Sequence, residues 1–584
     1  MNEFTNNLTL QGKRIVQGAR LIPQIRLSVL RRVFTLMGKA EKRLLFVLLI
    51  VTLISFIFAS QNFLQAYTAV VPNQGGAYRE GIIGEPRFFN PLYATTSTDR
   101  ALVNLLYAGL YRYDENGNVV PDLATNFPEI SEDRKTYTVQ LREAQWHNGL
   151  PVTANDVVFT IRALQNPEYN SPKRNDWLAT TVSANDERTV VFTLSSVSGP
   201  FLYNLTLPII SEVVWSQIPA EDFMLSQGNL QPIGNGPYRM KEVEQLTDGK
   251  IQSITLESFS NFHNRPSYIK TLRIKFFEDA DSLLKALHGN QIDGFGFNQF
   301  ENRVRVEKSA KDLIIHQIPL PQYQALFFNT TVRSLGEARV RQAFNLAANK
   351  TQILEEVFDG QGLLIESPIL SQQVANLPQH DDVMDITTAI SLLEQGGWTL
   401  NPETNIREKG NQQLKYRLAT NENWINLRAA QLLIEQWRTL GVEIELVSMP
   451  TRELNEQVIQ PRAYDMLLFA HRLGADPDPF VFWHSSQTKA PGLNLSGYVN
   501  NSVDALISEA RAASDREIRD AKYLELHNIM KQDLPAIFLV QSVYTYAIHE
   551  KIDGFSMVKM PDETVRYFNL RDWYTDTKRI LKRN

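Results

Sequence analysis

Two carboxylates, Asp476 and Asp478, lie close together within the stretch Arg472–Phe480. Paired acids could catalyse hydrolysis or bind calcium. Hydrolysis or calcium binding would need more acids converging on the same loop. The glycine and prolines of the stretch allow a plainer interpretation, in which a turn merely tolerates aspartate.

A second group of polar side chains is the hydroxyl run Thr95, Thr96 and Ser97, which follows Asn90-Pro91-Leu92-Tyr93. Small hydroxyls are suited to hydrogen bonds with the main chain of a ligand. The alternative is a Ser/Thr turn that caps a helix beginning near Asp99.

Aromatic side chains follow the acidic stretch at Phe480, Phe482 and Trp483. Such rings could line pockets for ligand side chains, because each buries a large apolar area. Packing within the protein core is the alternative that the same residues allow.

Several catalytic and metal-binding classes are excluded by the absence of their motifs. The sequence holds no His-Glu-x-x-His, no Gly-x-Ser-x-Gly and no Walker-type glycine loop. It contains no cysteine, which excludes disulfides, thiolate metal sites, cysteine nucleophiles and cysteine-linked lipids. The nine histidines are scattered. We therefore expect no catalytic residue, no metal and no cofactor, and we predict that the chain is not an enzyme.

Composition indicates a large folded chain rather than a nucleic-acid-binding or disordered one. It has 584 residues, 43% of them hydrophobic, and a formal net charge of −5 from 59 basic and 64 acidic residues. This apolar content is sufficient for sizeable cores, and the nearly balanced charge gives no support for binding nucleic acid.

The elements that position these residues alternate between strand and helix patterns. We expect strands at Thr136–Leu141, Thr189–Leu194, Ser253–Glu257, Thr271–Phe277 and Val442–Val447. We expect helices at Thr153–Ala163, where Thr153 and Asp156 have capping-box spacing, at Ser282–His288 and at Asn426–Leu440. This alternation favours α/β lobes.

The N-terminal segment predicts a membrane anchor. Leu44–Ser60 holds no charge and reaches roughly 26 Å as a helix, at the short end of a bilayer span. Residues 1–43 carry nine basic residues, and the next basic residue after the span is Arg79. The positive-inside rule therefore predicts a cytoplasmic N-terminus and an exported remainder. The long basic region and poor cleavage sites favour an uncleaved signal anchor.

Several segments in order resemble one family, the ABC-transporter solute-binding proteins of the oligopeptide, dipeptide and nickel class. The resemblance extends from about Ala77 to Tyr574. The most specific match is Trp146–Phe159, which contains the Trp, Gly, Pro and Thr-Ala-x-Asp-Val of the family signature. Further matches occur at Gly84-Glu85-Pro86, Leu106–Asp114, Pro232–Tyr238, Phe327–Thr330 with Arg339–Phe344, and Gly441–Val447. The lipid-modified cysteine usual in the family is absent, and the apolar helix replaces it.

The resemblance implies an α/β, two-lobe periplasmic-binding-protein fold of class II-like form, here with an N-terminal transmembrane helix. We expect a basic cytoplasmic segment at 1–43, a signal anchor at 44–60, a linker at 61–76, lobe one at 77–318 and 548–584 with an extra subdomain at about 114–232, and lobe two at 319–547. Lys551–Asn569 resembles a final strand pair that returns to lobe one.

The resemblance also implies a function: capture of peptides outside the membrane and delivery to the permease and ATPase of an ABC importer, by a monomer. The family has an acidic residue that pairs with the α-amino group of the ligand, and Asp476 is the matching position. Thr95, Thr96 and Ser97 match a ligand-contacting loop. Gln322 and Tyr323 lie at the expected crossing between lobes, where they either face the cleft or pack the hinge. Leu473 replaces a tryptophan of the oligopeptide members.

Three alternatives remain. The same fold could carry an oligosaccharide or a chelated metal, because the class holds all of these. The chain could also be a peptide receptor or chaperone without a transport role. An extracellular hydrolase is disfavoured by the missing catalytic motifs.

Overall fold

The computed structural model describes residues 34–198, 201–297, 312–370, 374, 377, 384–474, 478–513 and 515–582. Its chain divides into two compact units, Met1–Val71 with Thr577–Asn584, and Pro72–Asp576. We call the first the anchor unit and the second the binding unit. Of the expected basic segment 1–43, residues 1–33 lie outside the described residues.

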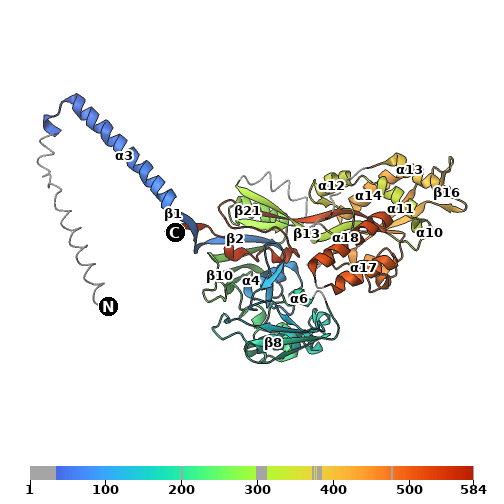
Figure 1. Ribbon diagram of the computed structural model, residues 1–584, viewed down its shortest axis with the longest axis horizontal. Coiled ribbons are helices and arrows are strands. Elements are labelled where there is room, and N and C mark those ends of the chain that lie inside the picture. The colour runs from blue at the N-terminus through green and yellow to red at the C-terminus, as the bar shows by residue number, and fades with distance from the viewer. Residues whose placement is uncertain are drawn as a thin grey trace. The chain divides into compact units, whose positions relative to one another are not determined.

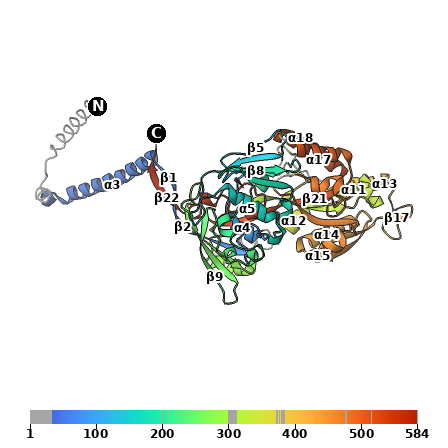
Figure 2. The same ribbon diagram turned by 90° about the horizontal axis from the view of Figure 1, so that it is seen from below.

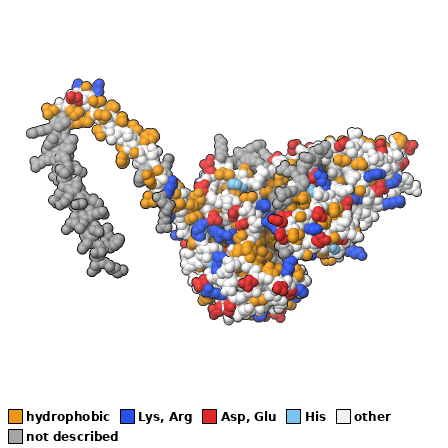
Figure 3. Space-filling model, viewed as in Figure 1, with side chains coloured by type: hydrophobic (Ala, Val, Ile, Leu, Met, Phe, Trp, Pro, Cys, Tyr) orange, Lys and Arg blue, Asp and Glu red, His pale blue; other side chains and the backbone are white. Residues whose placement is uncertain are grey.

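Within the described residues, the anchor unit contains a long helix and most of a short ribbon of two strands. Helix α3 (Lys39–Tyr67) includes the apolar run, and its window Lys39–Asn62 is long and apolar enough to cross a membrane, with none of that window buried. Hydrophobic side chains cover this helix (Figure 3). Strands β1 (Thr68–Asn73) and β22 (Asp576–Leu581) pair directly after it.

Helix and strand therefore occupy most of residues 61–76, where we expected a linker. The expected lobe-one segment 548–584 also differs from the structure, because residues 577–584 group with the anchor helix. The cause is the pairing of β22 with β1.

The binding unit is built on one mixed sheet that is continuous through both lobes. Within the described residues it has eleven strands, ordered β19-β18-β20-β13-β21-β12-β2-β11-β10-β9, with β14 beside β21. Strands β13 and β21 are the longest, and they pair antiparallel across the middle of the sheet (Figure 1). The strands are β2 (Gly75–Ile83), β9 (Tyr238–Gln245), β10 (Ile251–Ser258), β11 (Ile269–Phe277), β12 (Gly294–Phe297), β13 (Leu313–Phe328), β14 (Leu363–Leu364), β18 (Lys415–Asn421), β19 (Glu443–Met449), β20 (Met466–Arg472) and β21 (Ala536–His549).

The hinge is a break in the register between β13 and β21. Pro319 pairs with Val543, but the next pair is Tyr323 with Gln541, so β13 bulges between them. Ile318, Leu320 and Tyr544 pack in the lobe-one core, whereas Tyr323 packs in a lobe-two core. Residues of β13 before the bulge therefore pack in the core of lobe one, and residues after it pack in lobe two. On β21 the change from one core to the other occurs a few residues before the expected boundary at 548.

Alternation of side chains along the lobe-two strands produces two cores, one on each face of the sheet. In β13, Leu326 and Phe328 face one core, and Ala325 and Phe327 face the other. Helices cover both faces, with α17 and α18 on one side of β21 and α14 on the other (Figure 2). The main lobe-two helices are α11 (Ala338–Leu346), α12 (Lys350–Phe358), α13 (Ile386–Gln395), α14 (Trp424–Arg438), α17 (Asn501–Ala512) and α18 (Arg516–Asp533).

Lobe one carries an additional layer within the span 114–232. A small antiparallel sheet, β5-β6-β8-β7, packs with α5 there. Helix α5 begins where Thr153 and Asp156 predict it, since the Asp156 carboxylate accepts a hydrogen bond from the Thr153 N–H at 2.8 Å. The elements are β3 (Tyr111–Tyr113), β4 (Val119–Pro121), β5 (Glu129–Ile130), β6 (Thr136–Gln140), α5 (Ala154–Gln165), β7 (Thr180–Ala184), β8 (Thr189–Leu194), α6 (Phe201–Asn204) and α7 (Glu212–Trp215).

One expected element is wrong. Lys551–Asn569 does return to lobe one, where Met557, Met560 and Tyr567 join the core, but it forms loops and a 3₁₀ turn rather than a strand pair. Gly554, at a φ of 88°, and Pro561 interrupt any run long enough to form a ladder.

Candidate ligand-binding cleft

Three adjoining pockets lie in the binding unit, with volumes of about 350, 240 and 470 Å³. Lobe one lines the first apart from Gly474, and both lobes line the other two. The first two share Tyr203, Gly474 and Pro561 in their walls. The second and third share Leu202 and Arg519, among others. Because Pro319, Pro321 and Gln541 of the hinge strands also line the second pocket, the three form one cleft that opens where the lobes meet. We call them the aromatic, hinge and outer pockets.

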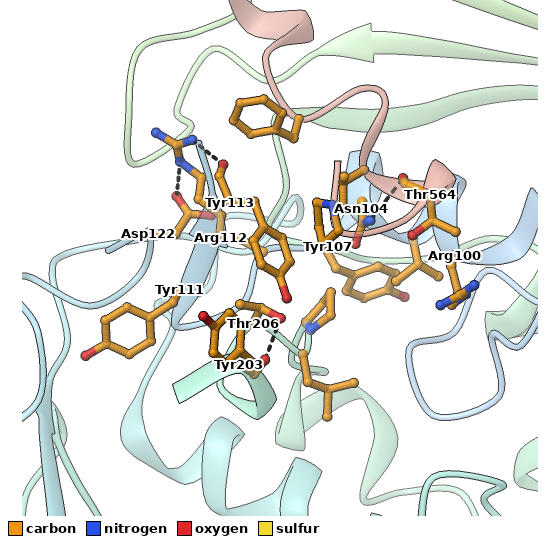
Figure 4. Close-up of a pocket in the computed structure, with 18 of the residues that line it drawn as sticks. Arg100, Asn104, Tyr107, Tyr111, Arg112, Tyr113, Asp122, Tyr203, Thr206 and Thr564 are labelled. Carbon is orange, nitrogen blue, oxygen red and sulfur yellow. Dashed lines mark hydrogen bonds and ion pairs between the residues drawn. The ribbon is translucent and has the colours of Figure 1, made fainter. Parts of the chain in front are cut away.

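The aromatic pocket is named for the rings in its wall. Tyr107, Tyr111 and Tyr203 surround it (Figure 4), and Trp177 and Phe568 also line it. Tyr107 comes directly after α4 (Ser97–Leu106), and its backbone N–H donates to the Val103 carbonyl in the last turn of that helix.

The Tyr107 hydroxyl is the most informative group of this pocket. The side chain is buried, and among the residues that the structure describes its hydroxyl has no hydrogen-bond partner. Burial raises the pKa of Tyr107, so the hydroxyl stays neutral and can donate. Since buried polar groups are nearly always paired, an unpaired hydroxyl on a residue that lines a pocket suits a ligand acceptor.

Opposite charges line the same pocket as pairs. Arg100 bonds Asp562 at 2.9 Å, and Arg112 lies 4.0 Å from Asp122 (Figure 4). Although burial alone would raise it, the pKa of Asp122 is lowered by the hydrogen bond from His263 at 2.9 Å and by nearby arginines. Asp122 is therefore ionised, and its charge is balanced within the protein.

Lys173 adds a cation whose charge is easily lost. Its ammonium donates to the Pro91 carbonyl at 2.6 Å, and burial, with Arg100 nearby, lowers the pKa of Lys173 to about 8. The pocket therefore combines an apolar wall with a few polar groups, as ligand sites commonly do.

The hinge and outer pockets are predominantly cationic. Arg516 and Arg519, from the first turn of α18, line both pockets, and Lys559 lines the hinge pocket. Burial, together with the charge of Arg516, lowers the pKa of Lys559. Arg134 and Arg511 lie on the outer pocket. This arrangement favours an anionic group of a ligand in the middle of the cleft.

The three predicted hydroxyls lie at the start of α4. Thr96 caps this helix, because the N–H of Asp99 donates to its hydroxyl at 3.0 Å. Ser97 is the first helical residue, and Thr95 before it is exposed. Thr96 therefore acts as a helix cap, which is the alternative that the sequence allowed. Ala94, directly before the three hydroxyls, lines the aromatic pocket.

The predicted residues of the crossing and of the aromatic run occupy different environments. Tyr323 and Trp483 are buried in a lobe-two core, where the Trp483 indole N–H donates to the Tyr323 hydroxyl at 3.3 Å. Gln322 is half-buried at the bulge of β13. Phe480 is also half-buried, and the guanidinium of Arg511 lies 4.4 Å from its ring centre. Of the four, Tyr323 and Trp483 have positions that indicate packing.

Asp476, the principal predicted ligand contact, lies outside the described residues. Gly474, two residues before it in sequence, lines both the aromatic and the hinge pockets. The second acid of the stretch, Asp478, is used within the protein, because its carboxylate accepts from the Phe480 N–H at 3.0 Å and pairs with Arg511 at 3.0 Å. Asp478 is therefore engaged within the protein.

Sequence reasoning missed the groups that dominate the cleft, Tyr107, Tyr203, Arg516, Arg519 and Lys559. One signal was available for the first of these, since Leu106–Asp114 carries three tyrosines in a segment that we had already matched to the family. The basic residues gave no signal, because cations on α18 and after β21 resemble any solvated surface.

Comparisons with known proteins match most of the chain. The model of the family described as "Bacterial extracellular solute-binding proteins, family 5 Middle" matches residues 118–492. The oligopeptide-binding protein AppA of Bacillus subtilis (strain 168) is 27% identical over 529 residues, covering 88% of this chain and 94% of AppA. The dipeptide-binding protein of Escherichia coli (strain K12) is 26% identical, covering 81% of this chain and 90% of that protein.

Another relative and a solved structure extend the comparison. The nickel-binding periplasmic protein of Escherichia coli (strain K12) is 26% identical, covering 72% of this chain and 81% of that protein. The structure of AppA from Bacillus subtilis in complex with a nonapeptide aligns with a TM-score of 0.64 at 27% identity. That alignment covers 86% of this chain and 99% of the AppA chain.

Proposed function

This chain belongs to the bacterial extracellular solute-binding proteins of family 5, and we propose that it captures peptides outside the membrane and delivers them to the permease of an ABC importer. The observation that carries the proposal is the cleft between two lobes joined by a bulged strand pair. A ligand that contacts both lobes favours the closed form by the extra affinity that it gains there.

The chemistry of the cleft suits a zwitterionic peptide. The cations of the hinge pocket, Arg516, Arg519 and Lys559, would receive the carboxylate of the ligand. The resemblance gives Asp476 the role of partner for the ammonium group. The aromatic pocket would take a ligand side chain, with the Tyr107 hydroxyl as a hydrogen-bond donor. Desolvated charges at both ends of the peptide would then be compensated.

The names of the relatives support this choice of cargo. The two relatives with the greater coverage of this chain bind an oligopeptide and a dipeptide, and the AppA structure holds a nonapeptide. The three adjoining pockets suit a ligand of several residues rather than an ion alone. Because one relative is named as a nickel-binding protein, a chelated metal is the alternative cargo that an experiment must distinguish from a peptide.

We further propose that α3 anchors the protein, with the N-terminus in the cytoplasm and the binding unit outside. Support comes from the apolar window Lys39–Asn62 and from the basic residues that precede it. Retention of the chain in membranes after alkaline carbonate washing tests the anchor. Protease protection of an N-terminal tag in intact cells tests the orientation, and a cleaved, soluble chain would contradict both.

Native mass spectrometry of the whole chain in mild detergent, followed by release of bound molecules, tests the cargo. We expect a distribution of peptide masses. A sugar or a metal chelate would keep the fold and overturn the peptide proposal. An empty protein that then fails to bind a peptide library in thermal-shift assays would also overturn it, in favour of a receptor or chaperone role.

The role of Asp476 is tested by Asp476→Asn, measured against one peptide with a free N-terminus and the same peptide acetylated there. We expect the variant to weaken binding of the free peptide by about 2–5 kcal/mol and to leave the acetylated peptide unaffected. Asp478→Asn is the matched control, because its carboxylate is already paired with Arg511. Equal effects of the two variants on both peptides would remove the role from Asp476.

A further inference from the structure

The end of the chain folds back onto the end of the anchor helix. The N–H of Lys582 donates to the carbonyl of Tyr67, the last residue of α3, at 2.9 Å. One residue further, the guanidinium of Arg579 donates to the Thr68 hydroxyl at 3.3 Å. We call the paired strands β1 and β22 the juxtamembrane ribbon. Basic side chains of the ribbon lie beside the end of the helix (Figure 3).

The depth of this ribbon follows from the length of the helix. The apolar window ends at Asn62, and Tyr67 lies five residues beyond it, which is roughly 7 Å along a helix. The polar layer on each side of a bilayer is roughly 5–7 Å thick. On the proposed anchor, Tyr67 and its partner Lys582 therefore lie at the level of the lipid head groups, where tyrosine is enriched.

The charge of the ribbon is of one sign. Residues 61–71 carry no charge, whereas residues 577–584 carry Lys578, Arg579, Lys582 and Arg583 and no acid. Strand β22 begins with Asp576, at its far end from Lys582, and all its residues are exposed. Three of these cations, Lys578, Arg579 and Lys582, are described residues that lie in or directly after β22, although the sequence places them more than 500 residues after the span.

We propose that the juxtamembrane ribbon binds the anionic phospholipid head groups of the outer leaflet. The inference rests on the proposed anchor, and it adds a second membrane contact made by the opposite end of the chain. Charge complementarity favours this occupant over a protein partner, because the continuous helix already places the ribbon at the lipid surface. Each basic side chain near an anionic surface strengthens attraction about fivefold, and the effect fades beyond a Debye length of about 8–10 Å.

The experiment places the full chain in nanodiscs of phosphatidylcholine alone and of phosphatidylcholine mixed with phosphatidylglycerol. Hydrogen exchange of the peptide covering 576–582 is then compared between the two. We expect slower exchange in the anionic discs, and we expect high salt to abolish the difference. The same comparison is made for the triple variant Lys578→Glu, Arg579→Glu, Lys582→Glu, in which we expect no difference between lipids.

A matched control carries the same change of charge elsewhere, in the exposed lysines Lys270, Lys415 and Lys489 of the binding unit, each changed to Glu. We expect it to behave as the wild type. Equal exchange of 576–582 in both kinds of disc, in the wild type, would overturn the inference alone. A chain that does not remain with the discs would instead contradict the anchor, and the inference with it.

Discussion

His147 is held as a neutral imidazole by the loop that it contacts. The N–H of Gly234 donates to its Nδ1 at 3.2 Å, so its Nε2 carries the proton and donates to the Gly236 carbonyl at 3.1 Å. Burial lowers the pKa of His147 to about 4, against an ordinary value of 6.5. Protonation would break the first of these hydrogen bonds, and so the Trp146–Phe159 motif depends on the neutral form.

A pH dependence follows from that shift. Between pH 6.5 and 4 the unfolded chain gains the proton and the folded chain does not, so stability falls as the pH falls. We expect His147 to contribute about 2 kcal/mol to this loss, discounted for its partial exposure. Urea unfolding of the fragment 72–576 at several pH values measures the slope. The variant His147→Gln should flatten it, and an unchanged slope would assign the effect to other groups, such as the buried His471.

Two tyrosines distinguish packing from binding. The Tyr323 hydroxyl lies within hydrogen-bond distance of His471 Nδ1, at 3.1 Å, and accepts from the Trp483 indole. Tyr323→Phe leaves both partners unpaired in the core, so we expect a loss of about 1–3 kcal/mol in unfolding free energy and no change in peptide affinity. A large loss of affinity with unchanged stability would place Tyr323 in the site after all.

Tyr107→Phe should have the opposite effect to Tyr323→Phe, lowering peptide affinity without changing stability. The Tyr107 hydroxyl has no partner among the described residues, so removing it should leave the unfolding free energy unchanged. If the hydroxyl bonds the ligand, affinity should fall about 2–10-fold. Isothermal titration with one peptide, run beside the Tyr323→Phe variant, makes the comparison, and unchanged affinity would show that the ligand does not use the aromatic pocket in this way.

What the sequence revealed of individual site residues depended on local chemistry. Thr96 could be predicted as a helix cap because capping needs only neighbours in sequence. The ion pair of Asp478 could not be predicted, because its partner Arg511 is supplied by α17, on a distant part of the chain. The unpaired hydroxyl of Tyr107 was equally invisible, since an unmet hydrogen bond is a property of the folded surroundings.

At the scale of elements, the Asp156 carboxylate joins three segments. It accepts from the Thr153 N–H at 2.8 Å, from the Glu212 N–H at 2.8 Å and from the Trp146 indole at 3.3 Å. The start of α5, the start of α7 and the loop at Trp146 therefore share one buried anion. One carboxylate therefore gives Trp146 and Asp156, ten residues apart in sequence, a joint structural role.

Asp156→Ala should be severe because it leaves three donors without partners. We expect a loss of about 3 kcal/mol or more in the unfolding free energy. Thr153→Ala is the matched control at the same helix end, with an expected loss of about 1 kcal/mol. Thermal and urea unfolding of both variants measures the difference. Similar, small losses in the two would show that Asp156 acts only as a helix cap.

Strands and helices were largely predictable from periodicity and caps. The strand Thr189–Leu194 matches β8 in both bounds, and α8 (Ala280–His288) ends before Gly289 as expected. The strand pair predicted at Lys551–Asn569 was wrong for a physical reason. Its apolar residues pack into the lobe-one core from loops, and burial alone gives a sequence pattern that does not distinguish a strand from a loop.

At the scale of the whole molecule, the pairing of distant segments was beyond the sequence. The family resemblance implied two lobes, but not that one sheet continues through both, which depends on β13 and β21 keeping register on either side of a bulge. The return of β22 to the anchor helix was missed because the resemblance covers only the exported part up to about Tyr574. The last strand has no counterpart in the motifs that located the rest.

One hydrogen bond links the lobes at the edge of the outer pocket. Arg134, in the turn between β5 and β6, donates to the Ala512 carbonyl at the C-terminus of α17 at 2.7 Å. A cation there also interacts favourably with the helix dipole. Because the bond spans the cleft beside residues that line it, we expect the ligand-bound form to keep it. Arg134→Ala should then weaken peptide affinity about 2–10-fold, the value of one such bond.

The same variant should leave each lobe intact, because Arg134 is half-exposed and its bond joins separate parts of the binding unit. Arg188→Ala is the matched control, since Arg188 pairs with Glu143 inside lobe one and spans no cleft. Small-angle scattering with and without peptide should show a looser ligand-free form for Arg134→Ala only. If affinity and scattering are unchanged, this contact affects neither the bound form nor the balance between forms. Closure would then depend on the ligand or on other contacts between the lobes, such as the Arg472–Glu563 ion pair at 3.6 Å.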